Sequence, residues 1–247
     1  MTRYNWKLEL RRRIWNTLES RGIARFPRPV YGRIPNFHGA EQACTKASLL
    51  DVVKEAKVIK VDPDSPLKEV RRLLLLKGKT IVMPTPRLRK GFLVLNGNDI
   101  PRRVIDEAAT IKGAFMYGRL VIDPWAIPSI DLFIVGSVVV SRINGVRLGK
   151  GGGYSDLEYA ILLESGRIKQ EIPIITIVHD IQVLNEPLRK EKHDVPVDII
   201  VTPTKVMNVI ERENRPTGLI PEILSNEHKF LPIVKYVLEK KRCNKKI

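Results

Sequence analysis

The sequence is poor in cysteine and lacks long apolar runs. Its two cysteines, Cys44 and Cys243, lie far apart and form no CxxC pair, so we expect neither a disulfide framework nor a cysteine-rich zinc site. Apolar runs reach about 4–8 residues, well short of a membrane-spanning helix. The first residues also lack the apolar segment of a signal peptide. These absences predict a cytoplasmic protein without a membrane partner.

Basic residues outnumber acidic ones. The 247 residues include 43 Lys and Arg against 27 Asp and Glu, for a formal net charge of +16. This excess predicts RNA or another polyanion as a partner, or a ligand rich in phosphate. A charged surface of the thermophile type is the alternative, although such surfaces are usually more balanced. With 43% hydrophobic residues the chain can bury a core, and its length fits one large domain or two small ones.

A basic, glycine-rich stretch runs from Arg147 to Asp156 and reads RLGKGGGYSD. An apolar run precedes it and a helical pattern follows it, which predicts a loop between a strand and a helix. Glycine lets backbone N–H groups approach a phosphate, and the helix N-terminus adds partial positive charge. Arg147 and Lys150 would add full charges. Asp156 lies where a carboxylate could hold magnesium on the same phosphates.

An ordinary turn is the alternative interpretation of this stretch. Glycine clusters often mark turns, and basic residues are common throughout the chain. The stretch also matches neither the P-loop nor the dinucleotide-binding fingerprint, because it lacks the Gly-Lys-Ser/Thr triplet and a suitably spaced acidic residue. Both interpretations therefore stay open on the residues alone.

Short apolar strands alternate with helices along the chain, which predicts a mostly parallel sheet covered on both faces. Ligands bind such sheets beyond the carboxyl ends of the strands, where the glycine stretch, residues 83–87 and His179-Asp180 would lie. We expect strands at residues 57–61, 80–83, 91–95, 131–140, 174–178 and 199–201. We expect helices at residues 6–20, 38–54, 65–76, 101–110, 156–163 and 220–241.

Residues 1–37 read as an N-terminal helix followed by a proline-rich segment. Lys7 and Arg11 are four residues apart, so they share one face of the helix. The two cations repel unless an anion bridges them, and a solvated basic face is the alternative. Three prolines and three aromatic residues in 26–37 exclude a helix or a central strand and predict an ordered strap across the body.

A second polar stretch, residues 191–198, reads EKHDVPVD. Asp194 is a loop carboxylate near a predicted strand, so it could join Asp156 in holding a metal ion. A turn residue whose side chain caps the backbone is the alternative. His193 is interpreted as a polar turn residue, and no histidine is paired in sequence with a Ser or Cys nucleophile.

The glycine-rich stretch, the segment HDVPVD at 193–198, and Lys7 with Arg11 together resemble the 5-formyltetrahydrofolate cyclo-ligase family, also called methenyltetrahydrofolate synthetase. The resemblance runs through most of the chain in the same order. It implies one domain, residues 1–247, folded as a Rossmann-like three-layer α/β/α sandwich. It also implies a ligase of one-carbon metabolism that uses ATP and Mg²⁺ to convert 5-formyltetrahydrofolate to 5,10-methenyltetrahydrofolate.

The resemblance also implies a set of site residues. ATP binding falls to Lys7, Arg11, Arg147, Gly149, Lys150, Gly151, Gly152, Gly153 and Tyr154. By the same resemblance, Arg147 and Lys150 would be catalytic residues, and Asp156 and Asp194 would bind the magnesium ion. Contact with a folate-like substrate falls to Glu69.

The departures from the family pattern lie mostly on the folate side. Ser155 stands where the family usually has a second tyrosine. Glu69-Val70 is followed by Arg71-Arg72, where the family commonly has a threonine, and Val135-Gly136 replaces a Pro-Gly pair. The residues that the resemblance assigns to phosphate binding therefore match the family pattern, while those near the expected folate site differ from it.

Residues 33–37 (RIPNF) and 83–88 (MPTPRL) are similar to a subgroup, the methenyltetrahydrofolate synthase domain-containing proteins. Some of its members are linked to RNA binding and carry a separate RNA-recognition domain, of which we find no aromatic signature here. Three functions therefore stay open: an ATP-dependent cyclo-ligase or close relative, a non-catalytic nucleic-acid-binding protein on the same fold, and a regulatory nucleotide-binding module. Either a monomer or a homodimer is compatible with the sequence.

Overall fold

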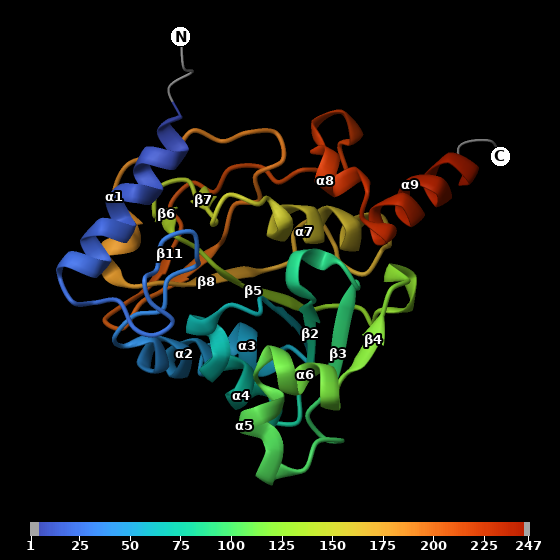
Figure 1. Cartoon of the computed structure of the whole chain (residues 1–247), viewed down its shortest axis with the longest axis horizontal. Helices are drawn as coiled ribbons and strands as arrows, with labels where there is room; N and C mark the ends of the chain where they lie inside the picture. The colour runs from blue at the N-terminus through green and yellow to red at the C-terminus, as the bar shows by residue number, and fades with distance from the viewer. Residues whose placement is uncertain (1–4, 245–247) are drawn as a thin grey trace.

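A large, mostly parallel sheet forms the centre of the computed structural model (Figure 1), which describes residues 5–244 and side chains up to residue 241. The start of the predicted N-terminal segment and the Cys243 side chain lie outside this part. Within it, one sheet has eight strands in the order β11-β10-β8-β5-β1-β2-β3-β4. Its strands are β1 (Val58–Val61), β2 (Thr80–Pro84), β3 (Phe92–Asn96), β4 (Arg119–Val121), β5 (Leu132–Gly136), β8 (Ile174–Ile177), β10 (Ile199–Val201) and β11 (Val206–Asn208).

The five central strands of this sheet, from β10 to β2, pair in parallel. Both edges end in antiparallel strands, β3 and β4 on one side and β11 on the other. Strand β5 is buried along its whole length, which explains its unbroken apolar sequence. The predicted α/β class with a mostly parallel sheet is confirmed. After β1 the chain winds first to β2 and later to β5 on the opposite side, so the strand order reverses between β1 and β5.

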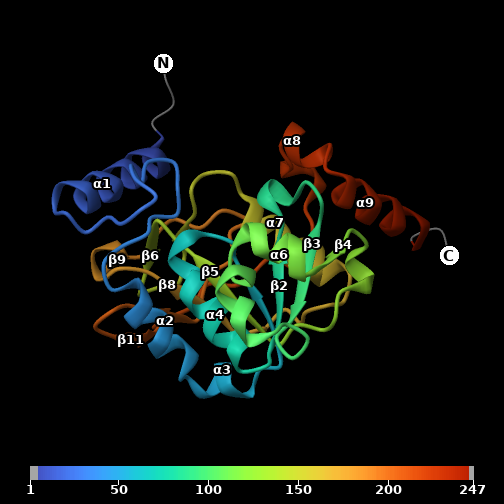
Figure 2. The same ribbon diagram turned by 60° about the horizontal axis from the view of Figure 1, so that its bottom comes forward.

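Helices cover both faces of the sheet (Figures 1 and 2). The face covered by α2–α6 buries Cys44, Ile59 and Leu74, and the face covered by α7 and α9 buries Phe133 and Tyr159. The helices of the first face are α2 (Ala40–Ser48), α3 (Asp51–Glu55), α4 (Lys68–Leu76), α5 (Ile105–Ala108) and α6 (Ile111–Tyr117). Those of the second are α7 (Tyr154–Glu164), α8 (Asn226–Lys229) and α9 (Pro232–Asn244).

Helix α1 (Trp6–Ser20) and the proline-rich strap close one end of the body. They pack on a small sheet formed by β6 (Val139–Ser141), β7 (Arg147–Leu148) and β9 (Val183–Leu184). Val30 of the strap is fully buried, and the indole Nε1 of Trp15 donates to the carbonyl of Arg33 at 3.0 Å. The strap is therefore fixed to α1.

Several boundaries differ from the sequence expectations. The helix expected at 38–54 is two helices, because the chain is extended at Leu50. The region 220–241 has a 3₁₀ turn and the short α8 before α9, which begins at Pro232, a residue suited to the first turn of a helix. Strands β4, β7, β9 and β11 have two or three residues each, too few to show an alternating pattern. None of the described helices combines the length and apolar composition needed to cross a bilayer.

Candidate functional site

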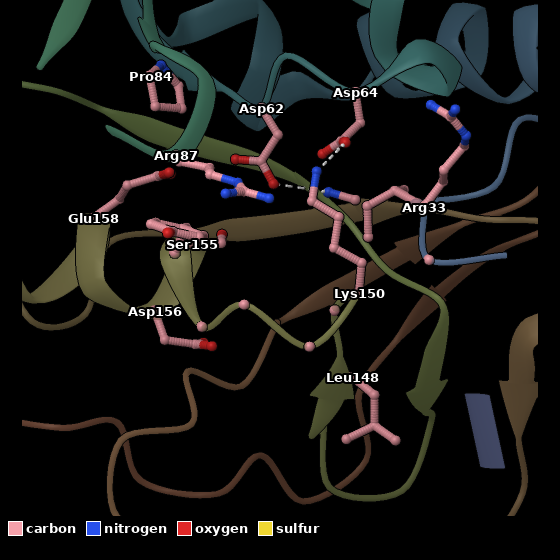
Figure 3. A pocket seen from close by; sticks show the side chains of 18 of the residues that line it. Arg33, Asp62, Asp64, Pro84, Arg87, Leu148, Lys150, Ser155, Asp156 and Glu158 are labelled. Carbon is pink, nitrogen blue, oxygen red and sulfur yellow. Dashed lines mark hydrogen bonds and ion pairs between the residues drawn. The ribbon is translucent and has the colours of Figure 1, made fainter. Parts of the chain in front are cut away.

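A cavity of about 920 Å³ opens at the carboxyl ends of β1, β2 and β5. This is the point where the strand order reverses, which is where ligands bind in open α/β sheets. Figure 3 shows its two main walls, the loop after β1 with Asp62 and Asp64, and the glycine-rich loop with Lys150. Helix α1 and the strap complete it, the strap through Arg33 and Ile34.

The glycine-rich loop, residues 149–153, connects β7 to α7. Gly151 and Gly153 have φ angles of +112° and +67°, which favour glycine. A Cβ at Gly149 would meet no atom closer than the Arg147 Nη1 at 3.8 Å, so the loop is open in front. Within residues 5–241, no side chain caps the N-terminus of α7. The loop and the first turn of α7 therefore form a concave backbone surface suited to an anion.

Two cations, Arg147 at the end of β7 and Lys150 in the loop, already have carboxylate partners. Arg147 is buried, and its Nη2 lies 3.2 Å from the Oδ1 of Asp156. Its Nε, although buried, has no hydrogen-bond partner among the described residues, and neither does the hydroxyl of Ser155. Lys150 is half-exposed and crosses the cavity to Asp64, at 3.0 Å (Figure 3). The two unpartnered donors are the kind of group that a bound phosphate would satisfy.

The cations of α1 reach the same cavity. The Nε of Arg11 donates to the carbonyl of Gly149 at 2.6 Å, and the Nζ of Lys7 lies 3.3 Å from Asp194 and 3.1 Å from Glu191. Burial lowers the pKa of Arg11, although Asp194 and Glu191 oppose this. The repulsion expected between Lys7 and Arg11 is thus offset by carboxylates of the 191–194 loop.

Asp156 and Asp194 lie on the same side of the cavity. Asp156 accepts from the backbone N–H of Val195 at 3.2 Å, and Asp194 accepts from that of Glu191 at 2.7 Å. Burial raises the pKa of Asp156 and nearby Asp194 adds to this, while Arg147 opposes it. No group of three or more His, Cys, Asp or Glu within residues 5–241 could hold a metal ion. Magnesium is usually held by one or two carboxylates together with substrate phosphates, so this pair fits a magnesium–nucleotide complex.

The remaining predicted residues form two groups, those that line the cavity and those that do not. Tyr154 lines the cavity, as does His193, whose Nε2 lies 3.7 Å from Asp194. Glu69 lies on α4 and pairs with Arg72 at 2.7 Å, and it is not among the residues that line the cavity. Nor is His179, which caps a 3₁₀ turn after β8. The structure thus brings the predicted phosphate residues together and leaves the predicted folate residue apart.

Sequence reasoning missed a buried charged cluster, which we call the charged floor: Lys60, Asp62 and Glu158. Lys60 is fully buried and pairs with Asp62 and, at 2.5 Å, with Glu158. Burial raises the pKa of Glu158 to about 7, with Lys60 opposing. Burial would also raise the pKa of Asp62, but Lys60 and Arg147 outweigh it and lower that pKa.

Arg71 fixes the loop that carries this cluster. Its buried guanidinium donates to the carbonyls of Asp62 at 2.5 Å and Asp64 at 3.2 Å. Two sequence signals pointed here: Lys60 is a charge inside an apolar strand, and Glu158 is a charge inside an apolar helical run. Both are unusual in buried elements unless paired.

Taken together, the fold and this cavity define an α/β protein with a site at the switch point of its sheet that is lined by paired basic and acidic side chains and by a glycine-rich loop. The chain belongs to the 5-formyltetrahydrofolate cyclo-ligase family, whose model matches residues 3–203. A human methenyltetrahydrofolate synthase domain-containing protein is 42% identical over 219 residues, covering 86% of this chain and 56% of that protein. A Danio rerio protein of the same name is 38% identical over 240 residues, covering 93% and 60%.

Among solved structures, the NMR structure of Aquifex aeolicus 5,10-methenyltetrahydrofolate synthetase is similar, with a TM-score of 0.51 and 18% identity. The match covers 89% of this chain and 100% of that one, and it concerns the fold. This chain spans between 56% and 64% of the length of the curated relatives it matches.

Proposed function

We propose that this chain is an ATP- and Mg²⁺-dependent ligase of the cyclo-ligase type, acting on 5-formyltetrahydrofolate or a close relative. The observation that carries the proposal is convergence: Lys7 and Arg11 from α1 meet Arg147 of β7 and Lys150 of the glycine-rich loop in one cavity. These cations are separated by more than 130 residues in sequence, so a merely basic chain would not be expected to gather them at the sheet's switch point.

The proposed chemistry needs positioning and charge neutralisation more than a side-chain nucleophile. A formyl oxygen is a poor leaving group, and transfer of the γ-phosphoryl group to it converts it to a good one. The N10 amine of the substrate, which lies outside the pterin ring, then attacks the activated carbon and loses its proton, and inorganic phosphate leaves. Arg147 and Lys150 would balance the charge on the transferred group, and Lys7 and Arg11 would hold the remaining phosphates.

Asp156 and Asp194 would hold Mg²⁺, which supplies further neutralisation of the phosphate charge. For this, Lys7 must release Asp194 and Arg147 must loosen its contact with Asp156. Both cations are then free to turn to the phosphates. The pairs seen here therefore keep the site neutral until an anion takes the place of the carboxylates.

The volume of the cavity leaves room for an acceptor beside the phosphates. Asp62, Asp64 and Glu158 face this space, so the acceptor side offers oxygen atoms to N–H groups. A pterin ring carries such donors, and this supports a folate-like acceptor. Glu69, paired with Arg72 outside the cavity, would not contact that acceptor in this arrangement.

The test is turnover of 5-formyltetrahydrofolate with ATP and Mg²⁺, followed by the absorbance of the methenyl product. We expect Asp156→Asn to lower kcat about 100-fold or more, since it removes a magnesium ligand. Asp106→Asn, at an exposed carboxylate on α5, is the matched control and should leave turnover unchanged. The proposal would be contradicted if the unaltered protein forms no product from a substrate that is shown to be neither oxidised nor degraded.

Nucleic-acid binding on the same fold is the second candidate. Its support is the exposure of basic clusters away from the cavity, at Arg12-Arg13 and Arg102-Arg103. Contacts to phosphates alone would make such binding sequence-indifferent and steeply dependent on salt. Asp156→Asn separates the two functions, because it should abolish magnesium-dependent turnover and leave RNA binding unchanged or tighter.

A further inference from the structure

A second cavity, of about 350 Å³, lies on the other side of the glycine-rich loop. It shares residues 151–153, Asp156, His193 and Glu227 with the first cavity, so the loop is part of a wall common to both. Its far wall is the segment 216–228, which lies beyond residue 203, where the family match ends. Figures 1 and 2 place the α8 part of this segment beside α7.

The two cavities differ in their cations, although carboxylates such as Asp156 and Glu227 line both. Lys7, Arg11, Arg147 and Lys150 all line the first. Within the described part of the chain, no lysine or arginine lines the second. Its walls are mostly apolar and come from Leu157, Ala160, Leu219, Ile220, Ile223 and Leu224. Phosphates are therefore favoured on one side of the loop, and an uncharged, flat group on the other.

We propose that the second cavity binds the base and ribose of the nucleotide whose phosphates lie on the glycine-rich loop, which leaves the first cavity for the acceptor substrate. This inference rests on the proposed function, since it assigns a place to the nucleotide of that reaction. It adds a binding subsite built by a segment outside the family match.

The far wall is fixed in place rather than loosely apposed. The Nε2 of His228 lies 2.9 Å from the carbonyl of Gly152, and its ring packs edge-on against Tyr154 at 5.0 Å between centroids. On the other flank, the backbone N–H of Leu219 donates to Glu164 of α7 at 2.9 Å. These contacts hold the segment against the loop and α7, so the cavity is preformed. Its volume falls in the range of small-ligand pockets.

Photolabelling with 8-azido-ATP tests the position of the base directly, because the reactive group is on the purine. We expect the label on peptides containing residues 216–228 or 157–160, and its loss when excess tripolyphosphate competes. Label on residues 27–34 or 84–87, which line the first cavity, would overturn the inference while leaving nucleotide binding intact. If neither ATP nor tripolyphosphate binds the protein, the proposed function fails and the inference falls with it.

A paired variant adds a thermodynamic check. Ile223 is 44% exposed, so Ile223→Gln should fold normally while removing apolar contact with the base. We expect about fivefold weaker ATP binding and unchanged tripolyphosphate binding in this variant. Ile210→Gln is the control, since Ile210 is also exposed and lines neither cavity. An equal loss for ATP and tripolyphosphate in Ile223→Gln, or no loss for ATP, would contradict the assignment.

Discussion

The loop side of the cavity and the charged floor are both built from cation–carboxylate pairs, but they differ in burial and in what they leave open. On the loop side, the Lys150 side chain is 46% exposed in its pair with Asp64, and Arg147 keeps an unpartnered Nε. On the floor, Lys60 has no exposed surface and lies between Asp62 and Glu158.

This difference in burial predicts different roles. A partly exposed ion pair such as Lys150–Asp64 contributes about 0–1 kcal/mol, so an incoming anion can replace this carboxylate at little cost. Breaking a buried pair strands a charge away from water, which costs about 3–5 kcal/mol. We infer that Lys150 exchanges partners during binding and that the floor is a permanent frame beneath it. Three variants test the two halves of this comparison.

The largest effect is expected on the floor. Lys60→Met leaves Asp62 and Glu158 buried without their shared cation, so the free energy of unfolding should fall by about 3–5 kcal/mol. For a chain of this size that corresponds to a decrease of roughly 10 °C in Tm, measured by thermal unfolding. Lys68→Met, at an exposed position on α4, is the control and should change Tm little. If Lys60→Met and the control have the same Tm, the charged floor does not stabilise the fold.

A loss of binding, with a smaller loss of stability, is expected at Arg147, which is buried on β7 beside the loop. Arg147→Gln removes the buried guanidinium and should weaken ATP binding about 10–100-fold, measured by calorimetry. Arg142→Gln lies in the same hairpin but is exposed, so it should bind ATP normally. Arg147→Lys keeps the charge and should recover part of the loss. Normal ATP affinity in Arg147→Gln would remove this residue from the phosphate site.

The smallest effect has the opposite sign. Asp64→Asn frees Lys150 from its carboxylate and removes a negative charge from the cavity, so tripolyphosphate should bind about two- to fivefold more tightly. The control is Asp51→Asn, which breaks a similar surface pair with Lys54 at 2.9 Å on α3. Weaker binding in Asp64→Asn would mean that the Lys150–Asp64 pair is needed intact, against the idea of exchange.

The residues predicted to bind phosphate line one cavity, whereas the charged floor was not predicted from the sequence, and the difference has a physical reason. Glycines between a strand and a helix mark local backbone geometry, which is readable from neighbouring residues. The charged floor depends on contacts between elements that are distant in sequence. Lys60 of β1 meets Glu158 of α7, which lies nearly 100 residues later in the chain. Glu69 illustrates the same limit, since the motif fixed its position in the chain but Arg72, one turn away, takes its carboxylate.

The fold class was predictable because the central strands are apolar throughout and alternate with helices. The short edge strands were not, since β4 has three residues and two of them are exposed. The segment 220–241 was expected to be mostly helical, and the contact between His228 and Gly152 had no signal in the sequence.

The most direct test of the exchange account is a titration with ATP and Mg²⁺, followed residue by residue through the backbone amide resonances. The account predicts the largest shifts at residues 149–155 and at Arg11, with small shifts at residues 58–61 of the floor strand. Largest shifts in the exposed clusters at residues 12–13 or 102–103, with an unchanged glycine-rich loop, would contradict it.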